Sequence, residues 1–155
     1  MVPALMKLLA AVVISSMLTQ VDGGSPAVDA GAPAPSMRLE IGGVRSAKGH
    51  VLIAVYRAGD RFSETGQTAF RKERIAAAPG TMTVEVKDLP VDTYALALVH
   101  DENDNLKIDT GLFGIPTEGF CFSKNAMGMF GPPTFKDAAV SHAVGSGVQK
   151  VALRY

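Results

Sequence analysis

The chain has 155 residues, which is a usual length for one domain, and it carries 15 basic and 15 acidic side chains. Nucleic-acid-binding proteins normally show a basic excess on one face, so this balance argues against that class. Gly and Pro account for 16 and 9 residues, and Trp is absent. Together with short runs rich in Val, Ile and Thr, this composition predicts an all-β fold with many turns.

The first residues differ in character from the rest of the chain. An apolar run at residues 8–18 follows a short segment that carries Lys7. The run is short for a membrane span and typical of the core of a signal peptide. We therefore expect a signal peptide at residues 1–22, with an uncleaved membrane anchor as the alternative. Residues 23–36 are rich in Pro, Ala and Gly and predict a linker. The folded domain then spans residues 37–155 and is exported, into a periplasm or out of the cell.

Hydrophobic patterns predict the strands of this domain. In chain order, strands are expected at residues 37–41, 51–56, 81–86, 93–100 and 149–155. The run at 51–56 is apolar on both faces, which indicates a central strand. Residues 71–75 are charged and fit either a short strand or a turn of helix. About seven strands at this spacing favour a Greek-key β-sandwich.

A long segment between Thr110 and Asp137 shows no strand of more than a few residues. It holds five of the seven phenylalanines, namely Phe113, Phe120, Phe122, Phe130 and Phe135. Long irregular connections are usually functional or disordered, and this one is too aromatic for disorder. We expect one long loop packed on the sandwich. Its phenylalanines form the core of the loop, or some of them line a ligand or partner surface beside His100.

The most informative motif is a turn rich in Asp and Asn at residues 101–109. Side-chain oxygens stand at its relative positions 1, 3, 5 and 9, on Asp101, Asn103, Asn105 and Asp109. At position 7, Lys107 offers its backbone carbonyl. Ca²⁺ takes about six to eight oxygen ligands from such a turn. The sequence therefore predicts a Ca²⁺ site here.

Two positions depart from a calcium loop of the EF-hand type. Leu106 stands where a glycine normally permits the sharp turn, and a bulky residue is disfavoured at positive φ. Leu112 stands where an EF-hand has a bidentate carboxylate, and Glu118 is the candidate to supply one. The alternative is a metal-free loop, in which Asp and Asn side chains accept hydrogen bonds from nearby backbone N–H groups. Four acidic residues against one lysine favour a counter-ion.

The block HDENDNLKIDTGLFGIPTEGF, followed by FS and GMFGPPTFKDAAV, resembles the signature of an uncharacterised bacterial family, domain of unknown function 2141. With the preceding LPVDTYALALV, the resemblance covers most of residues 37–155. It implies an exported, prealbumin-like β-sandwich, and no activity comes with it. The family pattern runs Asp-Glu-Asn-Gly-Asn-Gly-Lys-x-Asp, and here Asp104 and Leu106 replace its two glycines. The positions that match are Asp101, Asn103, Asn105, Asp109 and Glu118.

Other candidate chemistry is sparse. Cys121 stands alone between two phenylalanines, where a small buried side chain is expected. Ser123 and Ser141 lack the Gly-x-Ser-x-Gly motif of a hydrolase nucleophile. His100, directly before the acidic turn, either orients the loop or acts as a metal ligand or base.

These observations leave three hypotheses for function. The first is a binding or accessory module of the cell envelope, with a protein or a glycan as its partner. The second is an enzyme of unrecognised type that uses His100, Asp101 and Glu118, although no catalytic residue is assigned. The third is a metal-free structural domain of the envelope. Membrane contact is expected only through an uncleaved N-terminal segment.

Overall fold

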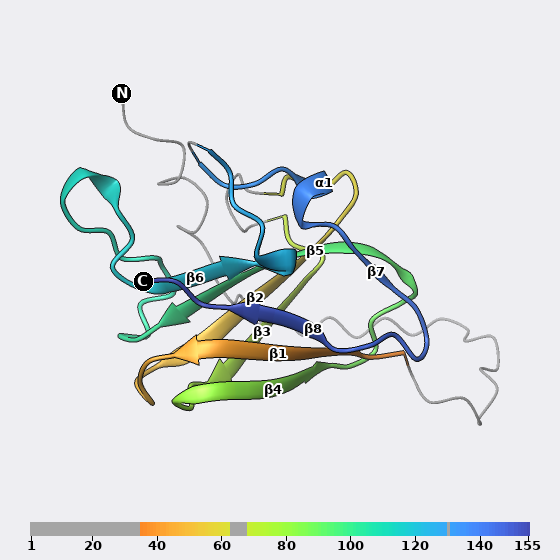
Figure 1. The fold of residues 1–155 in the computed structure, drawn as a ribbon, viewed down its shortest axis with the longest axis horizontal. Helices are drawn as coiled ribbons and strands as arrows, with labels where there is room; N and C mark the ends of the chain where they lie inside the picture. The colour runs from red at the N-terminus through yellow and green to blue at the C-terminus, as the bar shows by residue number, and fades with distance from the viewer. Residues whose placement is uncertain (1–34, 63–67, 130) are drawn as a thin grey trace, which may run out of the picture.

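The computed structural model describes residues 35–62, 68–129 and 131–155 (Figure 1). As predicted, these residues form an all-β fold. Its strands are β1 (Met37–Val44), β2 (His50–Arg57), β3 (Arg71–Ala76), β4 (Gly80–Val86), β5 (Asp92–Asp101), β6 (Gly119–Phe122), β7 (Val140–His142) and β8 (Gln149–Ala152). Helix in the described residues is limited to short turns at η2 (Leu112–Gly114), η3 (Ser123–Asn125) and α1 (Phe135–Ala138).

Some sequence-based predictions fall on other parts of the chain. The predicted signal peptide, most of the predicted linker and Phe130 lie outside the described residues. Within the described ranges, no helix is long and apolar enough to cross a membrane.

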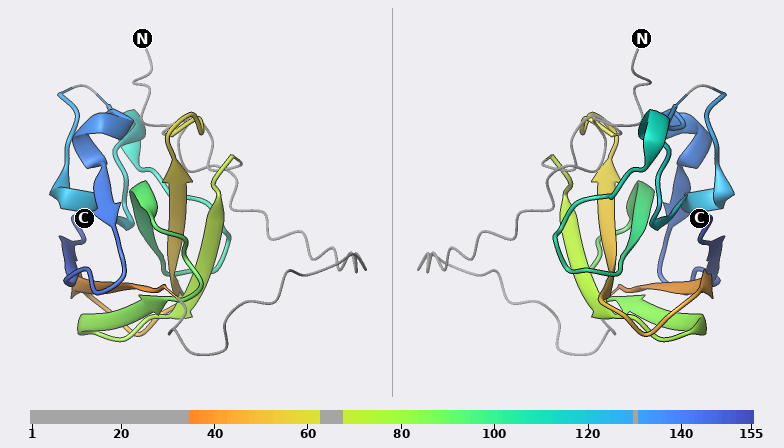
Figure 2. Two further views of the ribbon diagram at one scale, coloured as in Figure 1. Left: turned by 90° about the vertical axis from the view of Figure 1, so that its right-hand side faces the viewer. Right: turned by 90° about the vertical axis from the view of Figure 1, so that its left-hand side faces the viewer.

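The strands form two sheets that pack against each other (Figures 1 and 2). One sheet has the order β4-β1-β8 and the other has the order β3-β2-β5-β6, with β7 also paired to β5. The central strand β2 is apolar on both faces, as its sequence predicts. Val51 and Ile53 belong to the core between the sheets, whereas Leu52 and Ala54 belong to a second apolar cluster on the outer face.

This second cluster covers the outer face of the larger sheet. There β5 presents Ala95 and Ala97, whose small side chains allow large ones to pack closely. The large side chains include Phe62, Leu106, Ile108, Phe120, Phe122 and Phe135. The rings of Phe62 and Phe122 meet edge to face with their centroids 5.9 Å apart. The aromatic segment after β5 therefore packs on the sandwich, as predicted. It does so through β6 and α1 and not as one long loop, since Phe120 and Phe122 lie in β6 and Phe135 lies in α1.

The sandwich closes along one side near residue 155. The sequence predicts a strand over residues 149–155, but β8 ends at Ala152 because the next residues change partners. Leu153 donates its N–H to the carbonyl of Gly42 in β1 (2.9 Å), whereas Arg154 exchanges two backbone hydrogen bonds with Phe120 in β6 (2.9 and 3.0 Å). These residues join the two sheets and place Tyr155 beside the end of β5.

Both apolar clusters are built from residues between positions 37 and 153. A domain keeps its fold when its own core is complete. We therefore expect residues 35–155 to fold without the preceding segment, and the experiments below use this fragment.

Candidate functional site

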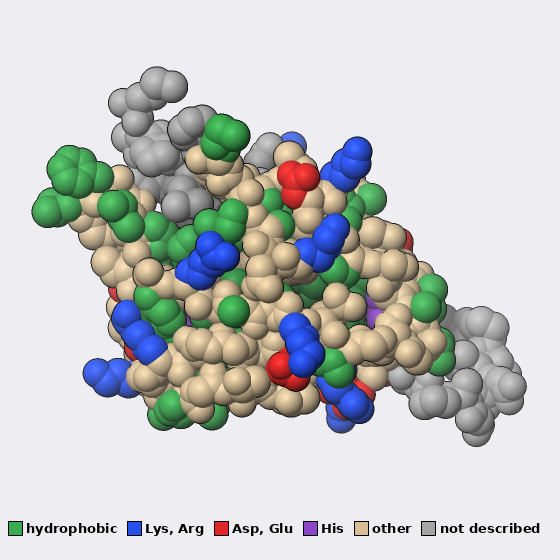
Figure 3. Space-filling view, in the orientation of Figure 1, with side chains coloured by type: hydrophobic (Ala, Val, Ile, Leu, Met, Phe, Trp, Pro, Cys, Tyr) green, Lys and Arg blue, Asp and Glu red, His purple; other side chains and the backbone are tan. Residues whose placement is uncertain are grey.

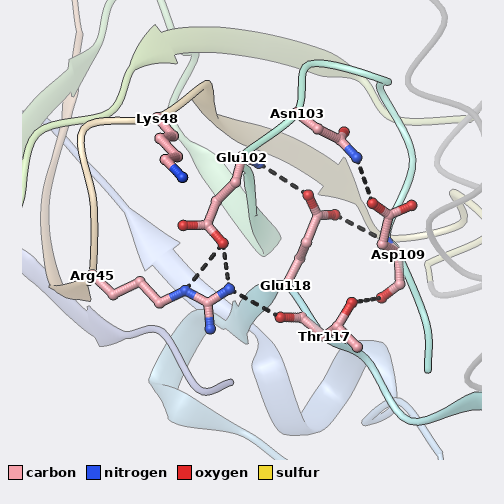
Figure 4. A pocket seen from close by; sticks show the side chains of 7 residues that line it. All are labelled: Arg45, Lys48, Glu102, Asn103, Asp109, Thr117 and Glu118. Atoms are coloured by element: carbon pink, nitrogen blue, oxygen red, sulfur yellow. Dashed lines mark hydrogen bonds and ion pairs between the residues drawn. The ribbon is translucent and has the colours of Figure 1, made fainter. Parts of the chain in front are cut away.

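Strand pairing brings the two ends of the 101–118 segment together. The acidic turn follows Asp101, the last residue of β5, and Glu118 immediately precedes β6. Because β5 and β6 are antiparallel, with His100 opposite Gly119, Glu118 returns to the start of the turn. Figure 4 shows its carboxylate between the backbone of Glu102 and that of Asp109.

Asp101 is the buried centre of the turn. Its side chain is fully buried, and its carboxylate accepts the backbone N–H groups of Asn105 (3.2 Å) and Leu106 (2.8 Å). The side-chain oxygens of Asn103 and Asn105 accept the N–H two residues further on, at 3.1 and 2.8 Å. This is the hydrogen-bond pattern of successive Asx turns. Lys107 takes part as the donor of the second of these bonds.

Asp109 closes the turn on its far side. Its two carboxylate oxygens accept the side-chain amide groups of Asn103 (2.6 Å) and Asn105 (2.9 Å). Its backbone carbonyl accepts the N–H (2.9 Å) and the hydroxyl (3.2 Å) of Thr117. The four side chains predicted as cation ligands therefore belong to one hydrogen-bonded turn.

Glu118 reaches the turn from outside it. The side chain is only 4% exposed, and its two oxygens accept the backbone N–H groups of Glu102 (2.9 Å) and Asp109 (3.0 Å). Burial raises the pKa of this carboxyl, and the negative charges of Asp109 and Asp101 raise it further, whereas the two N–H donors lower it. The carboxylates of Asp101 and Asp109 are thus close enough to that of Glu118 to repel it.

Two residues of the turn have a left-handed backbone. Asp104 and Leu106 both have a φ of 60°, and they occupy the two positions where the family pattern has glycine. Asp adopts this conformation readily, but for Leu it costs about 1–2 kcal/mol. The Leu106 side chain packs against the outer apolar cluster, which offsets part of that cost. The tight turn therefore forms despite the departure noted in the sequence.

Two acidic residues of the turn are paired with cations. Glu102 accepts hydrogen bonds from the Arg45 guanidinium and from the Ser46 hydroxyl (2.6 Å). Asp104 lies 2.6 Å from Nδ1 of His50 and 3.1 Å from the Arg74 guanidinium. The Arg74 hydrogen bond, with help from His50, lowers the pKa of Asp104.

The other three carboxylates have no such partner. Within the described residues, Asp101, Asp109 and Glu118 are bonded to N–H groups and to no cationic side chain. In the same part of the chain, no three Asp, Glu, His or Cys side chains are grouped so as to hold a metal ion. A cation at this turn would therefore need the amide oxygens of Asn103 and Asn105 as well.

The ion pair between Glu102 and Arg45 predicts how the stability of the domain depends on pH. The Arg45 hydrogen bond lowers the pKa of Glu102 from 4.5 to about 2. Because the folded-state pKa lies below the unfolded one, this carboxylate contributes stability above pH 4.5 that is lost as the pH falls toward 2. We expect Glu102→Gln to lower the free energy of unfolding at neutral pH by about 0.5–1 kcal/mol, since the pair is partly exposed. Urea unfolding should show the two proteins converging in acid, and parallel curves would contradict the assignment.

Beside the turn the surface is hollowed, with a volume of about 480 Å³. The hollow is lined by Arg45, Lys48, Glu102, Asn103, Asp109, Thr117 and Glu118 (Figure 4). Its charges are mixed, because Arg45 is paired with Glu102. The Lys48 ammonium extends into the hollow and has no hydrogen bond or ion pair to a described residue. Sequence reasoning missed Arg45 and Lys48, which lie more than 50 positions before the turn and carry no motif.

His100 is held in the interior by both ring nitrogens. It is fully buried; Nε2 donates to the carbonyl of Lys48 (2.9 Å), so Nδ1 accepts the hydroxyl of Tyr155 (2.7 Å). The Tyr155 oxygen in turn accepts the N–H of Arg45 (3.2 Å), whose guanidinium lies 4.2 Å from the centre of the Tyr155 ring. Burial raises the pKa of the Tyr155 phenol, which keeps it protonated as a donor.

Two glycines allow this close packing. A Cβ at Gly49 would lie 1.9 Å from the carbonyl oxygen of Asp101, and a Cβ at Gly119 would lie 2.5 Å from the Tyr155 ring. The Gly-His pair at 49–50 and the Glu-Gly pair at 118–119 are the sequence signals of these contacts. Only the glycine at 119 belongs to a motif that the sequence singles out.

The predicted aromatic surface is divided by the fold. Phe120 and Phe122 are buried in the outer cluster, and Phe135 packs against it half-buried. Phe113 stands apart with 89% of its surface exposed. Cys121 is buried in the core between the sheets, where burial raises the pKa of its thiol to about 12. The described structure therefore does not bring these phenylalanines and His100 to one surface.

Comparison with known families agrees with the sequence pattern. The family described as "Uncharacterized protein conserved in bacteria (DUF2141)" matches residues 39–150. The chain belongs to this family. The resemblance read from the acidic turn and the Gly-Pro-Pro block is thereby confirmed. Neither a curated protein nor a solved structure is significantly similar to the chain.

Proposed function

We propose that this member of DUF2141 is a non-enzymatic binding or accessory module of the bacterial cell envelope, and that its turn at 101–109 binds a hard cation such as Ca²⁺. The observation that carries the proposal is a missing positive charge. Asp101, Asp109 and Glu118 meet at one turn without an ion pair to any described residue, and two of them are buried. Arg45, which is already paired with Glu102, lies near enough to Glu118 for the two charges to attract, so it compensates this group only in part. Uncompensated charge is costly in the interior, and a bound cation would remove that cost.

The donor set suits such a cation. The residues that would hold it are Asp101, Asn103, Asn105, Asp109 and Glu118 through side-chain oxygens, and Lys107 through its backbone carbonyl. An oxygen that accepts one N–H keeps a second lone pair for a metal. Oxygen ligands alone are what Ca²⁺ prefers. Opposite charge would also lower the pKa of Glu118, which burial now raises.

The envelope location and the partner rest on further features. The apolar run at 8–18 and the linker at 23–36 support export. The hollow beside the turn offers the Lys48 ammonium, which is not paired with any described residue, together with amide and carboxylate groups. Mixed donors and acceptors of this kind suit the hydroxyl groups of a glycan or the polar edge of a partner protein.

Unfolding of residues 35–155 in excess chelator and in millimolar Ca²⁺ tests the cation. We expect Ca²⁺ to raise the free energy of unfolding by about 1–2 kcal/mol at several-fold to tens-fold the dissociation constant. That constant is expected at about 10⁻⁴–10⁻³ M, as in other extracellular modules. The gain should shrink in mild acid, because protons compete for the same carboxylates.

Asp109→Asn is the informative variant, because it removes one charge and keeps the size of the side chain. It should lose most of the Ca²⁺ effect, whereas Glu85→Gln, on the exposed side of β4, should keep it. If wild type gains nothing from Ca²⁺, or if Asp109→Asn gains as much, the cation site is wrong. The metal-free structural domain is then the better description.

The catalytic alternative has less support. Both nitrogens of His100 are engaged and the ring is buried, so it has no free lone pair to accept a substrate proton. Asp101 and Glu118 are likewise engaged by backbone N–H groups. An enzyme at this place would need these bonds to open.

A further inference from the structure

Two apolar loops stand out from the same end of the molecule. The first spans residues 110–117 and contains η2, and the second spans residues 126–129, directly after η3. Both lie at the upper end in Figure 1 and in the two views of Figure 2. In Figure 3, apolar side chains protrude from this end, and the largest group lies at the upper left.

The side chains of these loops are unusually exposed. Leu112, Phe113 and Ile115 are 84%, 89% and 63% exposed in the first loop. Met127 and Met129 are 48% and 89% exposed in the second. Residues 110–117 include no charged side chain. Single exposed apolar residues are normal, but each of these loops exposes two or three apolar side chains close together in sequence, which marks an interaction site.

The backbone holds the first loop in shape. The N–H of Gly111 donates to the carbonyl of Ile115 (2.8 Å), and the N–H of Gly114 donates to that of Gly111 (3.2 Å). An isolated bridge joins Thr110 to Pro116 across the base of the loop. At its tip Phe113 has a φ of 64°, a conformation that is uncommon for a bulky residue. These contacts hold the loop in a shape that presents Phe113 outward.

The second loop is also closely folded. A Cβ at Gly128 would lie 2.3 Å from the carbonyl oxygen of Gly131, so the chain turns back on itself there. Lys124 stands at its base in η3 and is exposed. The two methionines thus project from a fixed turn with a basic residue behind them.

We propose that this end of the domain inserts its two loops into the surface of a lipid bilayer. Both loops are convex and project separately, so a protein partner would need two pockets at a matching spacing, whereas a bilayer receives both at once. The first loop carries no charge and its own hydrogen bonds satisfy part of its backbone, so shallow insertion at the interface leaves few polar groups to desolvate. Lys124, exposed at the base of the second loop, would add a positive charge that attracts headgroup phosphates. This inference goes beyond the proposed cation site and does not rest on it.

The absence of tryptophan from the chain provides a direct test. In residues 35–155, Phe113→Trp and Met129→Trp each introduce a single indole, and Val144→Trp places one at a residue outside both loops that is 67% exposed. With vesicles of equal parts phosphatidylethanolamine and phosphatidylglycerol, in chelator, we expect the emission of the first two to shift to the blue and to be quenched by brominated lipid. The emission of Val144→Trp should not change.

Sedimentation with the same vesicles measures the affinity. Leu112→Ser combined with Phe113→Ser should lower the partition coefficient at least tenfold, which is about 1.4 kcal/mol. Val144→Ser should leave it unchanged. Because insertion is apolar, wild-type binding should persist at high salt and on phosphatidylcholine vesicles.

Three outcomes would overturn the inference. The first is that wild type does not bind vesicles. The second is that the double serine variant binds as well as wild type. The third is that binding occurs only on anionic vesicles and vanishes in high salt. Self-association that depends on Leu112 and Phe113, seen by sedimentation velocity without vesicle binding, would assign the loops to a second copy of the chain.

Discussion

Gly49→Ala is expected to lower the free energy of unfolding of residues 35–155 by about 3 kcal/mol or more. The added methyl group would lie 1.9 Å from the carbonyl oxygen of Asp101 and 2.9 Å from the carbonyl carbons of Asp101 and Glu102. These are backbone atoms at the start of the acidic turn, so they cannot move aside without moving the turn. Overpacking alone costs about 1–3 kcal/mol. The left-handed backbone of Gly49, with a φ of 62°, adds about 1–2 kcal/mol for any other residue.

Gly59→Ala is the matched control. Gly59 also has a positive φ, of 95°, but an added Cβ would meet nothing within 4 Å. This variant should show the backbone cost alone, and urea unfolding of the two variants separates that cost from the clash. If Gly49→Ala is no more destabilising than Gly59→Ala, the contact between the β1–β2 connection and the turn is not as close as the structure has it.

The second large effect is expected at His100. His100→Leu keeps a similar volume but removes a donor to the Lys48 carbonyl and an acceptor for the Tyr155 hydroxyl. Each hydrogen bond contributes about 0.5–1.5 kcal/mol, and water can replace part of each because Lys48 and Tyr155 are exposed residues. We expect the free energy of unfolding to fall by about 1–3 kcal/mol, measured in urea at neutral pH.

His142 provides the comparison for His100. It is also buried, but it makes one hydrogen bond, to the carbonyl of Leu89 (3.0 Å), and its Nδ1 has no partner among the described residues. His142→Leu should therefore be less destabilising than His100→Leu.

Tyr155→Phe removes the hydroxyl that bonds to His100 and so tests the same hydrogen bond from its other partner. The loss of unfolding free energy in the double variant Tyr155→Phe with His100→Leu should be smaller than the sum of the two single losses, by about 1 kcal/mol. Strictly additive effects would argue that His100 and Tyr155 do not interact.

The hydrophobic pattern was sufficient for the longer strands, whether one face is buried or both. Val84 and Val86 alternate with polar residues in β4, and Val51 to Tyr56 are apolar throughout β2, so both strands were predicted. β6 and β7 were missed because strands of four and three residues are too short for a period to show. Residues 71–75 stayed ambiguous because β3 is an edge strand, where charged side chains discourage further pairing.

The residues of the candidate site likewise fall into those that are neighbours in sequence, which could be predicted, and those that only the fold brings together. Asp101, Asn103, Asn105 and Asp109 were found because they are neighbours in sequence, and an Asx-rich turn is a local structure. Glu118 could be named only as a carboxylate further along the chain, because no local pattern places it at the turn. Arg45, Lys48 and Tyr155 could not be found at all, since they join the turn through strand pairing over 50 or more positions.

The sequence by itself determined the all-β class, the family and the residues of the acidic turn, because each depends on short-range pattern. Only the tertiary structure decided which charges of the turn are neutralised. Glu102 and Asp104 are paired because the β1–β2 connection, β2 and β3 carry Arg45, His50 and Arg74 to them. Asp101, Asp109 and Glu118 accept hydrogen bonds only from backbone and amide N–H groups of the described residues. Tertiary packing also buried Phe120 and Phe122 and left Phe113 exposed. Charge compensation and burial depend on which segments meet in space, and local sequence does not encode that directly.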